Sequence, residues 1–228
     1  MKPRIMHLLV MMAIPAVTSY CQGTFQNLDF ELANIPPGQV PGPVSDAAAI
    51  PGWIAYLGTQ PSAVFYDLPS AGAAQVTLLD APASIEGSFS VLLQGGLGNS
   101  PGSPGGVAPT EASIRQTGLV PVGAQSIFLK AQAGFIPLSV SLAGQNIPIF
   151  AVGTGPNYTL YGGDVSAFGG QPAELRFTAL PSNDNWLIDS IEFSSQAVPE
   201  PGFLGLFGLG AVALCWRFLQ KGRNAAAM

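Results

Sequence analysis

Short runs of strand-forming residues, each closed by glycine or proline, recur through the middle of the chain. The clearest run is 138–142, Leu-Ser-Val-Ser-Leu, in which apolar and polar residues alternate strictly. Such alternation is typical of a β-strand with one buried face. The 28 glycines and 21 prolines among 228 residues favour turns and resist helix interiors. No stretch of the middle region has the periodicity of an amphipathic helix.

The expected strands lie between residues 24 and 193. They are 24–31, 53–57, 63–66, 75–79, 88–94, 111–117, 126–132, 138–142, 147–150, 158–161, 174–179 and 186–193. The stretch 95–109 is rich in Gly, Pro and Ser and is expected to be a loop. Many short strands joined by such turns predict an all-β domain over residues 22–197, a β-sandwich of the jelly-roll type.

The first 21 residues predict a secretory signal peptide. Lys2 and Arg4 precede an apolar stretch, 5–17, that is too short to span a bilayer comfortably. Ser19 and Cys21 provide the small residues needed before a cleavage site. Lipidation at Cys21 is the alternative, and the bulky Tyr20 before it disfavours that alternative.

The C-terminal region predicts a membrane-inserted helix, 203–219. Residues 202–216 carry no charge, and the cations that follow would stay on the cytoplasmic side as a stop-transfer signal: Arg217, Lys221 and Arg223. Pro199 and Pro201 prevent a helix from running in from the domain.

Pro199-Glu200-Pro201, the apolar segment and the terminal cations together resemble the PEP-CTERM sorting signal of Gram-negative bacteria, over residues 198–223. The resemblance implies transient recognition by an exosortase, a membrane-embedded processing enzyme, and cleavage near the Pro-Glu-Pro motif. It also implies export through the inner membrane, membrane anchoring before processing, and delivery to the cell surface or an exopolysaccharide matrix. An inner-membrane-anchored periplasmic domain is the alternative if the tail is kept.

Charge and residue counts exclude several classes of function. The net charge is −5, and the only cations between the two ends are Arg115, Lys130 and Arg176, so no basic stripe exists for a nucleic acid. The single histidine, His7, and both cysteines lie in the terminal segments. The domain therefore has no Ser-His-Asp or Cys-His nucleophile and no His-ligated metal site.

Paired carboxylates acting on glycosides are the remaining enzymatic alternative. The candidates are scattered without a motif, at Asp67, Asp80, Glu86, Glu111, Asp164 and Asp184. We expect a protein that is not an enzyme.

Several short motifs resemble, in their order, the galactose-binding-like jelly rolls found in many carbohydrate-binding modules. They are 27–31, 50–53, 114–117, 164–171, 174–177 and 186–193. The resemblance implies a structural calcium between Glu31 on the first strand and Asp189 on the last, and no other cofactor. The alternative is that both are solvated carboxylates at strand edges, and no calcium-loop signature decides between the two.

Aromatic residues suggest a carbohydrate partner such as an exopolysaccharide. Tyr56 and Tyr66 are expected to be exposed and to stack on sugar rings, whereas Trp53 and Trp186 are expected in the core. The alternative is an inert structural matrix protein. Two aromatic side chains exposed on one surface would favour a binder, and buried ones a spacer.

Overall fold

The computed structural model describes residues 24–99, 107–132, 134, 136–181 and 185–198. The predicted signal peptide, 1–21, and the predicted membrane helix, 203–219, lie outside these ranges. Among the described residues, no helix is both long enough and apolar enough to cross a bilayer.

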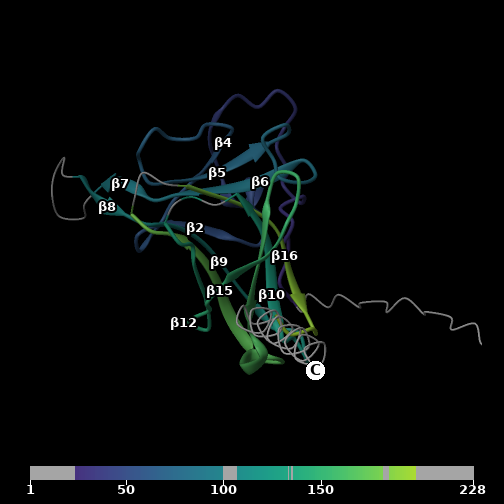
Figure 1. Cartoon of the computed structure of the whole chain (residues 1–228). Helices are drawn as coiled ribbons and strands as arrows, with labels where there is room; N and C mark the ends of the chain where they lie inside the picture. The colour runs from purple at the N-terminus through teal and green to yellow at the C-terminus, as the bar shows by residue number, and fades with distance from the viewer. Residues whose placement is uncertain (1–23, 100–106, 133, 135, 182–184, 199–228) are drawn as a thin grey trace, which may run out of the picture.

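The larger of two main sheets has eight strands (Figure 1). In spatial order they are β1 (Gly42–Val44), β4 (Val64–Tyr66), β5 (Gln75–Asp80), β6 (Phe89–Gln94), β16 (Asn185–Ser194), β10 (Ser126–Gln132), β14 (Thr159–Asp164) and β13 (Phe150–Thr154). All neighbours pair antiparallel except β4 and β5, which are parallel. The last strand of the described residues, β16, therefore lies inside the sheet.

The second sheet has six strands. In spatial order they are β12 (Gln145–Asn146), β11 (Ser139–Leu142), β15 (Pro172–Ala179), β9 (Ala112–Leu119), β2 (Ile54–Leu57) and β3 (Gln60–Pro61). A separate hairpin of β7 (Gly96–Asn99) and β8 (Val107–Thr110) projects to one side (Figure 1). The described helical turns are short: α1 (Asp46–Ala49) and the 3-10 turn η1 (Ser166–Phe168).

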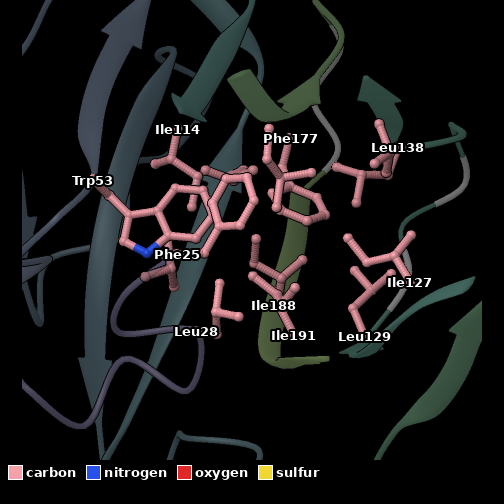
Figure 2. Packing of buried hydrophobic residues seen from close by; sticks show 14 of the residues in the cluster. Phe25, Leu28, Trp53, Ile114, Ile127, Leu129, Leu138, Phe177, Ile188 and Ile191 are labelled. Carbon is pink, nitrogen blue, oxygen red and sulfur yellow. The ribbon is translucent and has the colours of Figure 1, made fainter. Parts of the chain in front are cut away.

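One hydrophobic core fills the space between the two main sheets (Figure 2). Ile114 and Phe177 come from the six-stranded sheet, and Ile127, Leu129 and Ile188 from the eight-stranded sheet; all five are fully buried. Apolar side chains at alternate positions of both sheets produce this arrangement. The prediction of a β-sandwich is confirmed, as is the expectation that Trp53 and Trp186 are buried, at 2% and 5% exposure.

The strand expected at 24–31 is wrong. This segment folds into turns, with positive φ at Asn27 (50°) and Phe30 (61°). Side chains from elsewhere satisfy its backbone: Gln116 accepts from the Gln26 N–H at 2.5 Å, and the Trp53 indole donates to the Asn27 carbonyl at 3.0 Å. The apolar residues that suggested a strand, Phe25, Leu28 and Phe30, are instead buried in the core from these turns.

Two further expectations need correction. The stretch 95–109 was expected to be a loop, but it contains β7 and β8, whose small residues pair across the hairpin. Residues 147–149 of the expected strand 147–150 lie outside any strand, and the strand β13 begins at Phe150.

The outer face of the eight-stranded sheet carries a second, smaller hydrophobic cluster. Leu79, Leu92 and Leu187 point outward from three adjacent strands, and Ile85 covers them from the loop 81–88. We call this loop the latch loop. The latch loop covers the apolar side chains of β5, β6 and β16 on that face.

Candidate functional site

The outer face of the six-stranded sheet holds a connected set of aromatic and charged side chains. Directly paired residues of antiparallel strands point to the same side, and their buried neighbours point into the core. The register pairs Tyr56 with Ser113 and aligns Arg115 with Arg176. These side chains therefore stand on the solvent side. We call Tyr56, Arg115, Arg176 and their partners Glu111 and Glu174 the Tyr56 face.

Both arginines of the Tyr56 face are paired with carboxylates. Arg115 Nη1 lies 3.5 Å from Glu174 Oε2, and Arg176 Nη2 lies 2.5 Å from Glu111 Oε1. Arg176 Nε also donates to Ser113 Oγ at 3.3 Å. The face is therefore rich in hydrogen-bonding groups and electrically balanced.

The Tyr56 ring is held in place by Arg115. The guanidinium carbon lies 3.4 Å from the ring centroid, within cation-π range. This contact covers one face of the ring, so a ligand can stack only on the opposite face. A flat ring fixed beside charged hydrogen-bonding groups is the combination that sugar recognition uses.

A groove lies beside the Tyr56 face, between the β2–β3 hairpin and the β7–β8 hairpin. Its volume is about 660 Å³, and its polar lining includes Thr59, Gln60, Ser62, Thr110 and Glu111. This volume is in the range of small-ligand sites. Because Glu111 also pairs with Arg176, the groove and the Tyr56 face are continuous.

Tyr66, the second predicted stacking residue, lies in the other sheet. Its ring packs partly against the main core, and its hydroxyl donates to Asp80 Oδ2 at 2.7 Å. That hydrogen bond is the main cause that raises the pKa of Tyr66 to about 12. The structure thus does not bring Tyr56 and Tyr66 onto one sheet face.

Glu31 and Asp189, the predicted calcium pair, have different settings. Glu31 is exposed, and its Oε1 accepts hydrogen bonds from the N–H groups of Ser88 and Phe89, at 2.7 and 3.0 Å. Asp189 is 1% exposed, so the alternative of two solvated carboxylates fails for it. Asp189 Oδ2 accepts from Ser90 Oγ at 2.7 Å and from the Glu86 N–H at 3.1 Å, and Oδ1 accepts from the Ser190 N–H at 2.6 Å.

This arrangement does not fit calcium. Calcium needs six to eight oxygen ligands, whereas N–H and O–H donors already point at Glu31 Oε1 and at both Asp189 oxygens. Within the described parts of the chain, no three Asp, Glu, His or Cys side chains gather as a metal site. The two carboxylates instead hold the C-terminal part of the latch loop, at Glu86 and Ser88.

An ion pair also joins the latch loop to β10. Glu86 pairs with Lys130, and its Oε2 also accepts from Ser190 Oγ at 2.9 Å. Ser190 has a positive φ of 46°, at a bulge where β16 has one residue more than β10. The Lys130 hydrogen bond lowers the pKa of Glu86, so this carboxylate is ionised and a weak base.

Asp189 has the titration of a buried acid. Burial raises its pKa from 3.8 to about 6, although its hydrogen bonds from Ser90, Ser190 and Glu86 oppose the shift, and the nearby Glu31 charge adds to it. A raised pKa suits a general acid. However, Asp189 lies beneath the latch loop and is not open to a substrate.

Three of the other carboxylates considered for glycoside chemistry have hydrogen-bond or ion-pair partners within the domain. Asp80 accepts from Tyr66, Glu111 pairs with Arg176, and Asp164 accepts from the N–H of Ser166 in its own turn. Asp67 has a positive φ of 44°, and Asp184 lies outside the described residues.

From the sequence, Arg115, Arg176 and Glu174 were not assigned to a binding site, and Glu111 was considered only as a carboxylate for glycoside chemistry. The sequence did contain a signal for these residues. Arg115, Glu174 and Arg176 occupy polar positions in runs where polar and apolar residues alternate. Only the strand register shows that these runs are neighbours and that Tyr56 belongs with them.

The predicted sorting and stop-transfer residues all lie outside the described residues: Pro199, Glu200, Pro201, Arg217, Lys221 and Arg223. By sequence comparison, the PEP-CTERM protein-sorting motif matches residues 197–221, a range that includes these residues except Arg223. The chain carries a PEP-CTERM sorting motif. This motif indicates export and exosortase-dependent sorting to the cell surface.

No curated protein matches the chain in sequence. Among solved structures, the enzymatically active domain of tailspike protein 4 from bacteriophage CBA120 has a TM-score of 0.37 and 19% identity, over 67% of this chain and 21% of that chain. This protein thus spans about a fifth of the tailspike chain.

Two carbohydrate-binding modules are also similar. TmCBM61, solved with β-1,4-galactotriose, has a TM-score of 0.36 and 11% identity, over 76% of this chain and 98% of that chain. The family 11 module of Clostridium thermocellum, solved with a β-1,3-1,4-mixed-linked tetrasaccharide, has a TM-score of 0.34 and 9% identity, over 71% and 100% of the two chains. TM-scores this low carry no argument about ligand or activity, so function is argued from this chain's own residues.

Proposed function

We propose that this protein is an exported, exosortase-processed surface protein whose Tyr56 face binds a neutral polysaccharide without catalysis. The observation that carries the proposal is the fixed Tyr56 ring beside two arginine–carboxylate pairs on the outer face of the six-stranded sheet. We classify the sandwich as a jelly roll, since successive strands from β9 to β11 and from β14 to β16 alternate between the two sheets.

The preference for a neutral polymer follows from charge. The residues 22–198 contain twelve carboxylates and three cations, and each cation lies in an ion pair. An acidic polysaccharide would meet a negatively charged domain, with both arginines of the Tyr56 face already neutralised. Hydroxyl groups of a neutral sugar can hydrogen-bond to the charged pairs and stack on the tyrosine.

The two ends of the domain support processing at a membrane. The Thr24 N–H donates to the Leu119 carbonyl, and the Gln125 N–H donates to the Ser194 carbonyl. Residues 119 and 125 lie on either side of the short connection between β9 and β10. The first and last described segments of the domain therefore both lie near this connection, at one end of the sandwich. A precursor held at both ends by one membrane is compatible with this geometry.

Processing is tested by the intact mass of the protein from its host's envelope and medium. The proposal expects the loss of the leader and of everything beyond the Pro-Glu-Pro site, and it expects Glu200→Ala to abolish the C-terminal cut and surface retention. A mature mass that keeps residues 203–228 would support the inner-membrane-anchored periplasmic domain instead.

Sugar binding is tested by affinity electrophoresis of the detergent-solubilised full chain in gels that contain neutral β-glucan, galactan or anionic alginate. Retardation by a neutral polymer is expected to weaken about fivefold in Tyr56→Ala, because ring stacking contributes on the order of 1 kcal/mol. Tyr56→Phe keeps the ring and should bind normally. Tyr158→Ala, on the outer face of the other sheet, is the matched control. Retardation that is equal in all variants, or none with any polymer, would refute the binding proposal and leave an inert matrix protein.

A further inference from the structure

The chain does not leave the domain where its last strand ends. The Gln125 N–H donates to the carbonyl of Ser194, the last residue of β16, at 2.8 Å, and beyond the strand Ser126 Oγ donates to the Gln196 carbonyl at 2.6 Å. The Gln196 N–H donates to Ser194 Oγ at 3.1 Å. Residues 195–198, which we call the strap, are therefore held against the first residues of β10.

The end of the strap packs on the eight-stranded sheet. A Cβ atom placed on Gly162 would lie 3.1 Å from Val198 Cγ2 and 2.8 Å from the Phe128 ring. Gly162 and Phe128 are paired in β14 and β10 and point outward. Val198 is accordingly half-buried, on a spot that the glycine keeps open.

The strap overlaps the sorting motif. The motif covers residues 197–221, so its first two residues, Ala197 and Val198, are strap residues. Two residues of extended chain span only about 7 Å, and this is the greatest reach from Val198 to Glu200. Val198, the second residue of the motif, contacts the sheet, and Pro199 follows it directly in the sequence.

An enzyme that cuts a peptide bond binds extended chain on both sides of that bond. Just before the Pro-Glu-Pro site, the Gln196 carbonyl and the half-buried Val198 side chain contact the domain, whereas Ser195, Gln196 and Ala197 are otherwise exposed. The two contacting groups cannot lie in an enzyme's binding cleft and on β10 and β14 at once. Cleavage of a folded protein then follows the population of a locally opened state.

We propose that the strap shields the sorting motif, and that the exosortase processes only molecules whose strap has been released from the sheet. The strap controls access and takes no part in bond cleavage. The inference rests on the exosortase processing proposed above. The folded domain thereby sets the rate at which its own tail is removed.

The test follows precursor and product masses over time in the native host after a pulse of synthesis. Ser126→Ala removes the hydroxyl that holds Gln196, and it should speed processing about fivefold, as expected for the loss of one hydrogen bond from the closed state. A six-residue Gly/Ser spacer between Ser195 and Gln196 leaves the motif 197–221 intact and should speed processing at least as much. Ser84→Ala, which removes a similar hydroxyl-to-carbonyl bond at 3.2 Å in the latch loop, should leave the rate unchanged.

Release of the strap is measured separately in the Glu200→Ala background, where uncut precursor accumulates. Hydrogen exchange at the Gln196 amide should be faster with Ser126→Ala than without it. If exchange is faster but the processing rate is unchanged or lower, the shielding proposal is overturned. If wild-type protein is never processed, it is the proposed function that fails, so the two failures are distinguishable.

Discussion

The two outer faces of this sandwich differ in what lies on them. The outer face of the eight-stranded sheet is covered twice by the domain's own chain, by the latch loop over Leu92 and Leu187 and by Val198 over Gly162. The Tyr56 face carries ion-paired side chains and an aromatic ring.

The difference separates structural from functional use of similar residues. Lys130 and Arg115 each pair with a glutamate and each lie near a tyrosine ring, at 5.2 and 3.4 Å from the ring centroids. The Lys130 pair holds a loop over apolar side chains, whereas the Arg115 pair stands beside Tyr56 on the outer face. Tyr56 and Tyr66 are both half-buried, although the sequence predicted them to be exposed. The surroundings of an ion pair, more than its composition, therefore indicate what it does.

The largest expected effect compares outward-facing aliphatic residues on the two faces. Leu187→Ala should lower the free energy of unfolding by about 3 kcal/mol, because Leu187 is 5% exposed beneath the latch loop and its loss leaves a cavity. Ile54→Ala, at a position that is 48% exposed on the other face, should change it by about 0.5 kcal/mol or less. Urea unfolding of both variants measures the contrast, and equal losses would show that the two faces do not differ in this way.

The next effect concerns the buried carboxylate below the latch loop. The pKa of Asp189 is raised from 3.8 to about 6, so the folded protein binds this proton more tightly than the unfolded chain does. The resulting stability is present below pH 4 and is lost as the pH rises to about 6. It amounts to about 3 kcal/mol by linkage, since one pKa unit corresponds to about 1.4 kcal/mol.

Asp189→Asn removes this dependence and leaves the other carboxylates in place. Burial also raises the pKa of Asp46 and of Glu192, so the wild-type curve contains their contributions as well. The slope of unfolding free energy between pH 4 and pH 6 should therefore be less steep in Asp189→Asn than in wild type. Parallel curves would mean that Asp189 does not titrate in this range.

A smaller effect separates the two cation–tyrosine pairs. Lys130→Met should destabilise the protein by about 1 kcal/mol, since Glu86 then loses the partner that fastens the latch loop. Arg115→Met should have an effect below about 0.5 kcal/mol, as for other exposed ion pairs. Thermal unfolding under matched salt tests this ranking, and the reverse order would contradict it.

The smallest expected effect is that of calcium. Hydrogen-bond donors point at Glu31 Oε1 and at both oxygens of Asp189, so millimolar calcium and EDTA should give the same unfolding midpoint. A midpoint raised by calcium and lowered by EDTA would show that these carboxylates exchange their donors for a metal, as the resemblance to galactose-binding-like folds implied.

Local patterns predicted much of the fold. Alternation placed most strands to within a few residues, and the turn-rich composition predicted the all-β class, because both signals depend on near neighbours in the chain. The sorting motif is a linear feature as well, recognised by order and position. The same reasoning failed at 24–31, where apolar spacing suggested a strand but distant side chains such as Gln116 and Trp53 satisfy the backbone.

The sequence by itself determined the class of the fold, the burial of both domain tryptophans and the sorting motif, because each follows from short-range periodicity or from a contiguous motif. The tertiary structure alone decided that Asp189 is buried under a loop, that Tyr56 stands with Arg115 and apart from Tyr66, and that the strap lies on β10. Those relations join residues about 60 to 100 positions apart. Only the pairing of strands, set by the burial of both sheets against one core, brings such residues together.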